Sequence, residues 1–263
     1  MKKTVLFFML FAVILGNIIL PAQAQPVRYQ WYCKHVKDHV QPPLDQKLSF
    51  TEEHGAYYID RRHTDASSND KVIYLTFDAG YENGNIEKTL DILHNENVSA
   101  AFFVLQNLIL KNPELVKRMT DEGHLVCNHT AHHRDMSRYG NEAFLEELHT
   151  LENLFQDTVG QQMPKYYRPP EGVFSCENLI CAEENGYKTI FWSFAYPDWD
   201  NNKQMSNEKA KAIILDNLHN GEVMLLHPTS NTNVQILSDV IREIKAQGYR
   251  FGTLDELTGV EEQ

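Results

Sequence analysis

Residues 72–104 read VIYLTFDAGYENGNIEKTLDILHNENVSAAFFV. The apolar run over 72–77 predicts a buried strand, and the run over 100–104 predicts a second one. Between them, apolar residues recur along one face of a predicted helix over 86–95. A strand, a helix and a strand in this order are typical of a parallel α/β sheet.

The alternation continues to the end of the chain. Five more strands are predicted, over 125–128, 166–168, 188–192, 223–227 and 249–252. Five more helices are predicted, over 113–123, 142–159, 175–186, 206–219 and 233–247. We therefore expect an α/β fold, a distorted (β/α) barrel of about seven parallel strands.

The first 24 residues are typical of a signal peptide. Lys2 and Lys3 precede an apolar stretch, and small residues offer a cleavage site after Ala24. An uncleaved membrane anchor is the alternative, although the stretch is slightly short for a full span. We therefore expect the protein to be exported across the cytoplasmic membrane.

Three parts follow the predicted signal peptide. Residues 25–70 show no clear period, and we interpret them as an N-terminal extension packed on the barrel. Residues 71–257 form the barrel domain, and 258–263 form a C-terminal tail. No internal repeat or linker divides the barrel domain.

The composition excludes several classes of protein. Hydrophobic residues make up 42% and charged residues 23% of the chain, which is ordinary for a globular protein and unlike a disordered tail or a fibre. The net charge is −12, and after residue 3 no run of Lys and Arg is longer than the Arg61–Arg62 pair. We therefore expect no nucleic-acid partner. No feature implies a protein partner, and we expect a monomer.

Four cysteines lie beyond the predicted cleavage site, Cys33, Cys127, Cys176 and Cys181. They contain no Cys-x-x-Cys pair of the kind that usually holds structural zinc. Cys176 and Cys181 lie on different faces of one predicted helix, which disfavours a disulfide between them. We interpret the four as small buried residues, although exported proteins can form disulfides.

Residues that could carry chemistry gather directly after the predicted strands, where parallel α/β barrels place their active sites. These segments are 76–84, 128–133, 168–172, 192–199 and 225–228. Each residue has a structural alternative when taken alone, since Asp78 can belong to an ordinary turn, Arg168 to a surface ion pair and His227 to the core. Acids, histidines and an arginine at five strand ends together favour a catalytic site.

His129 and His133 lie four residues apart. That spacing brings two imidazoles onto one side of a helical turn and is common among metal ligands. Two surface histidines are the alternative. His132 lies between them and is expected to point another way.

The five segments resemble, in order, the motifs of the polysaccharide deacetylases, also called the NodB-homology family or carbohydrate esterase family 4. The family motifs are Thr-Phe-Asp-Asp-Gly, His-Ser/Thr-x-x-His, Arg-Pro-Pro-x-Gly, an Asp near Trp, and Leu-x-His. The likeness covers about residues 71–257. The run 77–84 and the extension that carries Trp31 are most similar to the delta-lactam-biosynthetic branch, which de-N-acetylates N-acetylmuramic acid in spore-cortex peptidoglycan.

The resemblance implies a role for each candidate residue. Asp78 would be the general base that activates water, and Arg168 would keep Asp78 ionised. His227 would protonate the leaving amine, with its pKa raised by Asp198. A backbone N–H near Glu171 would stabilise the oxyanion. The candidate substrate contacts are Tyr81, Glu82, Asn83, Glu171, Trp192 and Leu225.

The resemblance also implies a divalent metal on His129 and His133, with zinc favoured and manganese or cobalt as alternatives. One position departs from the family pattern. Ala79 stands where the family usually has a second Asp that ligates the metal. Because alanine cannot coordinate an ion, we expect the metal to be weakly held.

The implied function is that of an extracellular or cell-wall-associated hydrolase that removes N-acetyl groups from peptidoglycan. N-acetylmuramic acid is the favoured sugar, as a step in muramic delta-lactam formation. Three alternatives stay open, namely deacetylation of N-acetylglucosamine or chitin-type polymers, hydrolysis of O-acetyl esters, and a non-catalytic glycan-binding relative. An intact acid and base favour an enzyme, because a binding protein needs neither.

Overall fold

The computed structural model describes residues 26–65 and 67–260. The predicted signal peptide at 1–24 lies outside the described residues, as do the last three residues of the predicted tail. None of the described helices is long and apolar enough to cross a membrane.

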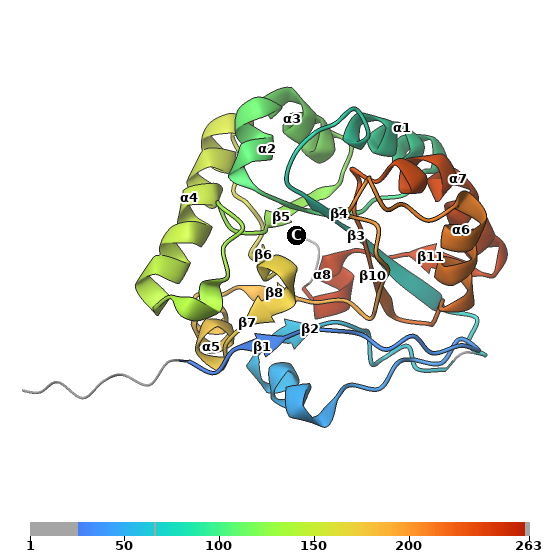
Figure 1. Cartoon of the computed structure of the whole chain (residues 1–263), viewed down its shortest axis with the longest axis horizontal. Coiled ribbons are helices and arrows are strands. Elements are labelled where there is room, and N and C mark those ends of the chain that lie inside the picture. The colour runs from blue at the N-terminus through green and yellow to red at the C-terminus, as the bar shows by residue number, and fades with distance from the viewer. Residues whose placement is uncertain (1–25, 66, 261–263) are drawn as a thin grey trace, which may run out of the picture.

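The centre of the fold is a curled sheet of nine parallel strands (Figure 1). Its strands are β2 (Ala56–Tyr57), β3 (Lys71–Ala79), β4 (Ala101–Val104), β5 (Leu125–Asn128), β6 (Tyr166–Tyr167), β8 (Lys188–Ile190), β9 (Phe194–Ala195), β10 (Glu222–Leu226) and β11 (Tyr249–Phe251). The order is β2-β8-β6-β5-β4-β3-β10-β9, and β11 pairs with the start of β3. The sheet forms a half-barrel, because its ladder ends at β2 and β9 without closing.

All seven predicted strands are present, so the distorted barrel is confirmed. The sheet has two more strands than the sequence predicts, β2 and β9. Each of them is two residues long, which is too short to show a hydrophobic period.

Helices cover the outer face of the sheet (Figure 1). They are α1 (Ile86–Glu96), α2 (Gln106–Lys111), α3 (Pro113–Asp121), α4 (Asn141–Val159), α5 (Cys176–Glu184), α6 (Asn207–Asp216) and α7 (Asn231–Ala246). Ser175 and Ser206 cap α5 and α6 as predicted, because each side chain accepts a backbone N–H of the first turn. The helices α2 and α8 (Leu254–Thr258) add to the six predicted ones.

Strand β3 separates two apolar layers. Ile73, Leu75, Phe77 and Ala79 belong to the outer layer, which packs against α1, α3, α6 and α7. Side chains alternate across a strand, so the residues between them face the interior of the half-barrel. There Val72 and Tyr74 pack with side chains of β4, β5, β10 and α8.

The N-terminal extension contributes strands to both sheets found among the described residues. Its strand β1 (Tyr29–Gln30) pairs antiparallel with β7 (Val173–Phe174), and its strand β2 joins the main sheet beside β8. Between them lies the 3₁₀ helix η1 (Gln46–His54). The Trp31 ring stacks on Phe191 at 4.2 Å between centroids, which anchors the extension beside the end of β8.

Candidate active site

The ladder register brings four candidate residues to one edge of the sheet. Asp78 lies near the end of β3 and His227 directly follows β10, and these two strands pair up to the residues just before them. His129 directly follows β5 and Arg168 directly follows β6, and these strands pair at their ends. The carboxyl edge of the sheet therefore gathers groups that are far apart in the sequence.

Arg168 is fully buried and its guanidinium is held on several sides. Nη1 donates to Asp78 Oδ1 at 2.9 Å, and Nη2 donates to Thr76 Oγ1 at 2.9 Å. Nε donates to the carbonyl oxygen of Ile190 at 2.9 Å, and the group lies 4.1 Å from the centroid of the Phe103 ring. A buried charge is costly unless it is paired and hydrogen-bonded, so these contacts fix both Arg168 and the carboxylate that it holds.

Asp78 is ionised at neutral pH. Burial raises its pKa, but the neighbouring charges, chiefly of His129 and Arg168, lower it by more. Burial also lowers the pKa of His129 to about 4, so that imidazole is neutral at pH 7. Arg168 is therefore the charged neighbour that matters most for Asp78 near neutral pH.

His227 and Asp198 form a second pair beside the first. Asp198 is 1% exposed, and its Oδ1 accepts the Nδ1–H of His227 at 2.7 Å. Its Oδ2 accepts the backbone N–H of His227, also at 2.7 Å. Burial lowers the pKa of His227, but the Asp198 charge and hydrogen bond raise it by more, so its pKa lies above the ordinary value. Because Asp198 binds the Nδ1–H, the protonated imidazole releases its other proton, from Nε2.

The two candidate metal ligands lie in an irregular loop, so the predicted helical turn is wrong. Thr130 and His133 have left-handed backbones, with φ of 69° and 57°. The loop still brings the rings of His129 and His133 together, with centroids 5.0 Å apart and planes at 70°. His132 points elsewhere, as expected, and its Nδ1 bonds to Glu147 at 2.8 Å.

The donor atoms of this loop fit a divalent cation. The Nδ1–H of His129 donates to the carbonyl oxygen of Arg168 at 2.8 Å, an arrangement usual for metal-ligating histidines. It leaves a lone pair on Nε2, which lies 3.5 Å from Asp78 Oδ2. That lone pair is the donor atom that His129 would offer to a metal ion, beside the carboxylate of the proposed base. Within residues 26–65 and 67–260, no three His, Cys, Asp or Glu side chains come together as metal ligands.

The three predicted substrate contacts after β3 differ in whether their side chains are already bound by other residues. Tyr81 is 48% exposed. Glu82 instead caps α1, since its carboxylate accepts backbone N–H groups that include that of Ile86 at 3.0 Å. Asn83 donates its amide to the carbonyl oxygen of Thr229 at 2.9 Å, which ties two loops together. Of the three, Tyr81 has the side chain most available to a ligand.

The remaining predicted contacts are Glu171, Trp192 and Leu225. Glu171 has a left-handed backbone (φ 55°) and an exposed side chain, and its N–H has no acceptor among the described residues. Gly172 follows with φ 67°, and a Cβ there would lie 2.8 Å from the Trp192 ring. That ring lies 5.7 Å from the Arg168 guanidinium. Leu225 is only 4% exposed, so it offers a ligand little surface.

Asn233 on α7 touches the site without having been predicted there. Its Nδ2 donates to Asp198 Oδ2 at 2.6 Å and to the carbonyl oxygen of His227 at 3.1 Å. An Asn three residues after a Ser at the start of a helix is typical of a cap, so the sequence pattern hides this contact.

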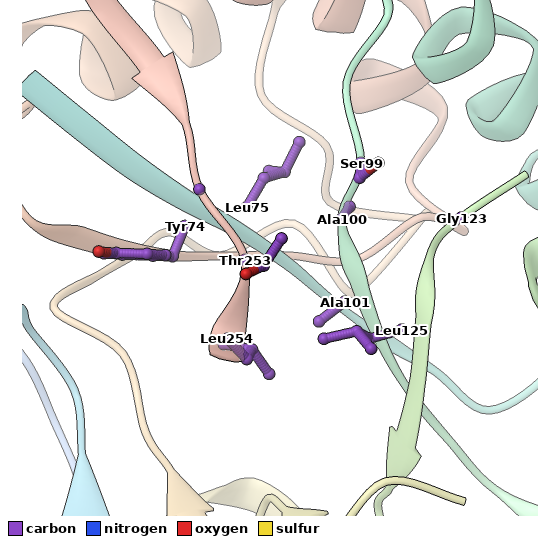
Figure 2. A pocket seen from close by; sticks show the side chains of 10 residues that line it. Tyr74, Leu75, Ser99, Ala100, Ala101, Gly123, Leu125, Thr253 and Leu254 are labelled. Atoms are coloured by element: carbon purple, nitrogen blue, oxygen red, sulfur yellow. The ribbon is translucent and has the colours of Figure 1, made fainter. Parts of the chain in front are cut away.

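Two other features do not belong to the site. A small pocket at the opposite end of the sheet is lined by segments before β4 and β5 and after β11 (Figure 2). Its side chains are mostly small or apolar, and none is a candidate catalytic residue. The four cysteines of the described residues are free, and burial raises the pKa of the Cys127 thiol, which agrees with inert packing.

Comparison with known proteins agrees with this geometry. The sequence pattern of the family described as "Polysaccharide deacetylase" matches residues 65–190. The chain is 37% identical over 248 residues to the peptidoglycan-N-acetylmuramic acid deacetylase PdaA of Bacillus subtilis, covering 94% of this chain and 92% of the relative. It is 32% identical over 195 residues to a peptidoglycan-N-acetylglucosamine deacetylase of Bacillus cereus, covering 72% of this chain and 89% of the relative.

The fold matches as well. The solved structure of Bacillus subtilis PdaA, described as a family 4 carbohydrate esterase, superimposes with a TM-score of 0.82 at 36% identity. The match covers 89% of this chain and 98% of the other.

Proposed function

The chain belongs to the polysaccharide deacetylase family, and we propose that it hydrolyses the N-acetyl group of N-acetylmuramic acid in peptidoglycan, as a step in muramic delta-lactam formation. The observation that carries the proposal is the pair of dyads at one sheet edge, Asp78 with Arg168 and His227 with Asp198. Amide hydrolysis needs a base and an acid, and these dyads supply one of each. The name of the Bacillus subtilis relative supports the choice of sugar.

Asp78 is the general base of the proposed reaction. It accepts a proton from water as the water oxygen forms a bond to the acetyl carbonyl carbon. Arg168 keeps the carboxylate ionised and, because it is buried and hydrogen-bonded through all three of its nitrogens, holds it in one orientation.

The negative charge that develops on the carbonyl oxygen needs a donor. The backbone N–H of Glu171 is the candidate, since no described residue accepts it and the left-handed backbone at residues 171 and 172 shapes the turn beside Arg168. The Glu171 side chain takes no part in stabilising the oxyanion, so its carboxylate is free to contact another part of the glycan.

His227 is the general acid. It gives the Nε2 proton to the sugar nitrogen as the carbon–nitrogen bond breaks, which releases acetate and leaves a free amine. Asp198 keeps the imidazole charged and oriented for this step, because its carboxylate binds both the ring and the backbone of His227.

Enzymes of this family are generally metal-dependent deacetylases. We propose that His129 and His133 hold a divalent ion, with zinc favoured over manganese or cobalt because imidazoles suit it. When bound, the ion supplies a positive charge that stabilises the oxyanion and lowers the pKa of water. With Ala79 in place of the second Asp of the family, the ion has one protein ligand fewer, so it is held more weakly than in relatives that carry that Asp.

The relatives modify peptidoglycan, and we propose that this chain works outside the cytoplasmic membrane, at the cell wall, after cleavage at Ala24. We further propose that it acts as a monomer, with the glycan strand as its partner. The negative net charge gives no attraction to an anionic wall, so recognition rests on short-range contacts such as Tyr81.

Mass spectrometry of reaction products tests the proposal. The protein without residues 1–24 is incubated with purified peptidoglycan, with chitin oligomers and with O-acetylated xylan. We expect loss of acetyl groups from muramic acid in peptidoglycan. Loss from glucosamine units alone would assign the other sugar, loss from xylan would indicate an esterase, and no product on any polymer would favour a glycan-binding protein.

A further inference from the structure

The side-chain amide of Asn233 contacts both Asp198 and the backbone of His227, the proposed acid. Asn233 is 2% exposed and belongs to the first turn of α7. Its Nδ2 bridges Asp198 Oδ2 and the carbonyl oxygen of His227, at 2.6 and 3.1 Å. Its Oδ1 accepts the hydroxyl of Tyr196, which fixes the orientation of the amide. Both the nitrogen and the oxygen of the Asn233 amide are therefore hydrogen-bonded inside the protein.

A second helix of the same chain shows what an Asn at this position does without such a neighbour. Helices α5 and α7 both begin with Ser-x-x-Asn, as Ser175 to Asn178 and Ser230 to Asn233. The Asn178 side chain accepts the Ser175 backbone N–H and closes a capping box. The backbone N–H of Asn233 donates to Ser230 Oγ, as that of Asn178 does to Ser175 Oγ, but the Asn233 side chain donates to Asp198 instead.

We infer that Asn233 is a positioning residue for the deacetylation, acting through Asp198 on His227. This inference rests on the proposed function, in which His227 is the acid. The side-chain amide of Asn233 donates to the carboxylate of Asp198, which is 1% exposed, and to the backbone carbonyl oxygen of His227, so it ties that carboxylate to the backbone of the acid. Asp198 is thus held in the one geometry that binds both the ring and the backbone of the acid.

The contact also sets how tightly the pair holds its proton. The Asn233 donor shares the negative charge of Asp198, so less of that charge acts on His227. Without the donor, the Asp198–His227 pair binds its proton more tightly, and its proton is lost at higher pH. The other charged groups that face His227 are Asp78 and Arg168, and neither contacts Asn233.

The test compares Asn233→Ala with Asn178→Ala as a matched control. For Asn233→Ala we expect kcat to fall by about 10-fold or more through loss of orientation, with KM little changed. The alkaline limb of the rate profile should move to higher pH. Asn178→Ala removes a helix-capping side chain of equal burial, so it should lower thermal stability and leave the rate profile in place. Tyr196→Phe, which frees the Asn233 amide to rotate, should give a smaller change in the same direction.

A titration of the His227 ring by NMR makes the result independent of turnover. We expect the ring to lose its proton at higher pH in Asn233→Ala than in the wild type. An unmoved titration and an unmoved limb in a folded Asn233→Ala protein would overturn the inference. If the wild type released no acetate from any glycan, the proposed function would fail, and the titration alone would still decide whether Asn233 controls the pair.

Discussion

Asp78 and Ala79 are neighbours in the chain and lie on opposite faces of β3. Asp78 faces the interior of the half-barrel, where Arg168 binds it, and Ala79 is fully buried in the outer apolar layer. The alternation of side chains along a strand causes this separation. The position where the family usually carries a metal-ligating Asp is therefore occupied here by a residue that packs against helices.

Replacing Ala79 by Asp tests this placement. A carboxylate among apolar side chains should lower the free energy of unfolding of the metal-free protein by about 3 kcal/mol or more. Ala79→Asn carries no charge and should cost less. Thermal or urea denaturation measures both variants. An Ala79→Asp protein as stable as the wild type without metal would mean that the side chain at 79 reaches solvent.

Removing the cation beside Asp78 should move the acid limb of the rate profile. Arg168 holds the pKa of Asp78 below its ordinary value, so in Arg168→Gln that pKa rises and the base is ionised only at higher pH. The acid limb of kcat/KM should shift to higher pH, and stability should also fall because a buried charge loses its partner. Arg138→Gln, at an exposed site, is the control and should leave the limb in place. A limb that stays in place in Arg168→Gln would exclude this role.

Removing the charge of Asp198 should move the alkaline limb of the rate profile. Asp198 raises the pKa of His227, so Asp198→Asn lowers it and the acid loses its proton at lower pH. The alkaline limb should therefore move to lower pH, which a pH–rate series measures. Lower activity with an unmoved limb would show that Asp198 supports the structure and not the charge of His227.

Metal binding should depend on the two histidines. Calorimetric titration of zinc into the metal-free wild type should show one weak site, and His129→Ala should abolish it because half of the protein ligands is gone. His149→Ala, on the solvent-exposed side of α4, is the control. Chelation should remove activity, and zinc, manganese or cobalt should restore it. Zinc binding that survives His129→Ala unchanged would place the ion elsewhere.

The sequence alone predicts most of the sheet, and its failures have local causes. Strands such as β3 and β10 are long enough to show their apolar runs. Strand β9 spans only Phe194–Ala195 and belongs to the sheet because it pairs with β10. The spacing of His129 and His133 predicts a helical turn, yet the left-handed backbone at Thr130 gives the loop another shape. The spacing of two histidines in the sequence does not determine the backbone conformation between them.

The site shows the same limit. The strand-end rule correctly brings Asp78, His129 and Arg168 to one edge, because parallel strands all end there. It cannot tell that Glu82 is used to cap α1, since an acid beside a strand end suits both a cap and a substrate contact. Nor can it find Asn233, whose role depends on α7 beginning beside Asp198.

The most direct test of the account is acetate release from muramic-acid-containing peptidoglycan by the wild type and by Asp78→Asn. Asparagine is nearly the same size and keeps an oxygen toward Arg168, so the protein should stay folded. Loss of a general base lowers rates by about 100- to 10,000-fold, and we expect a loss in this range. A folded Asp78→Asn protein that kept more than about a tenth of the wild-type rate would contradict the account.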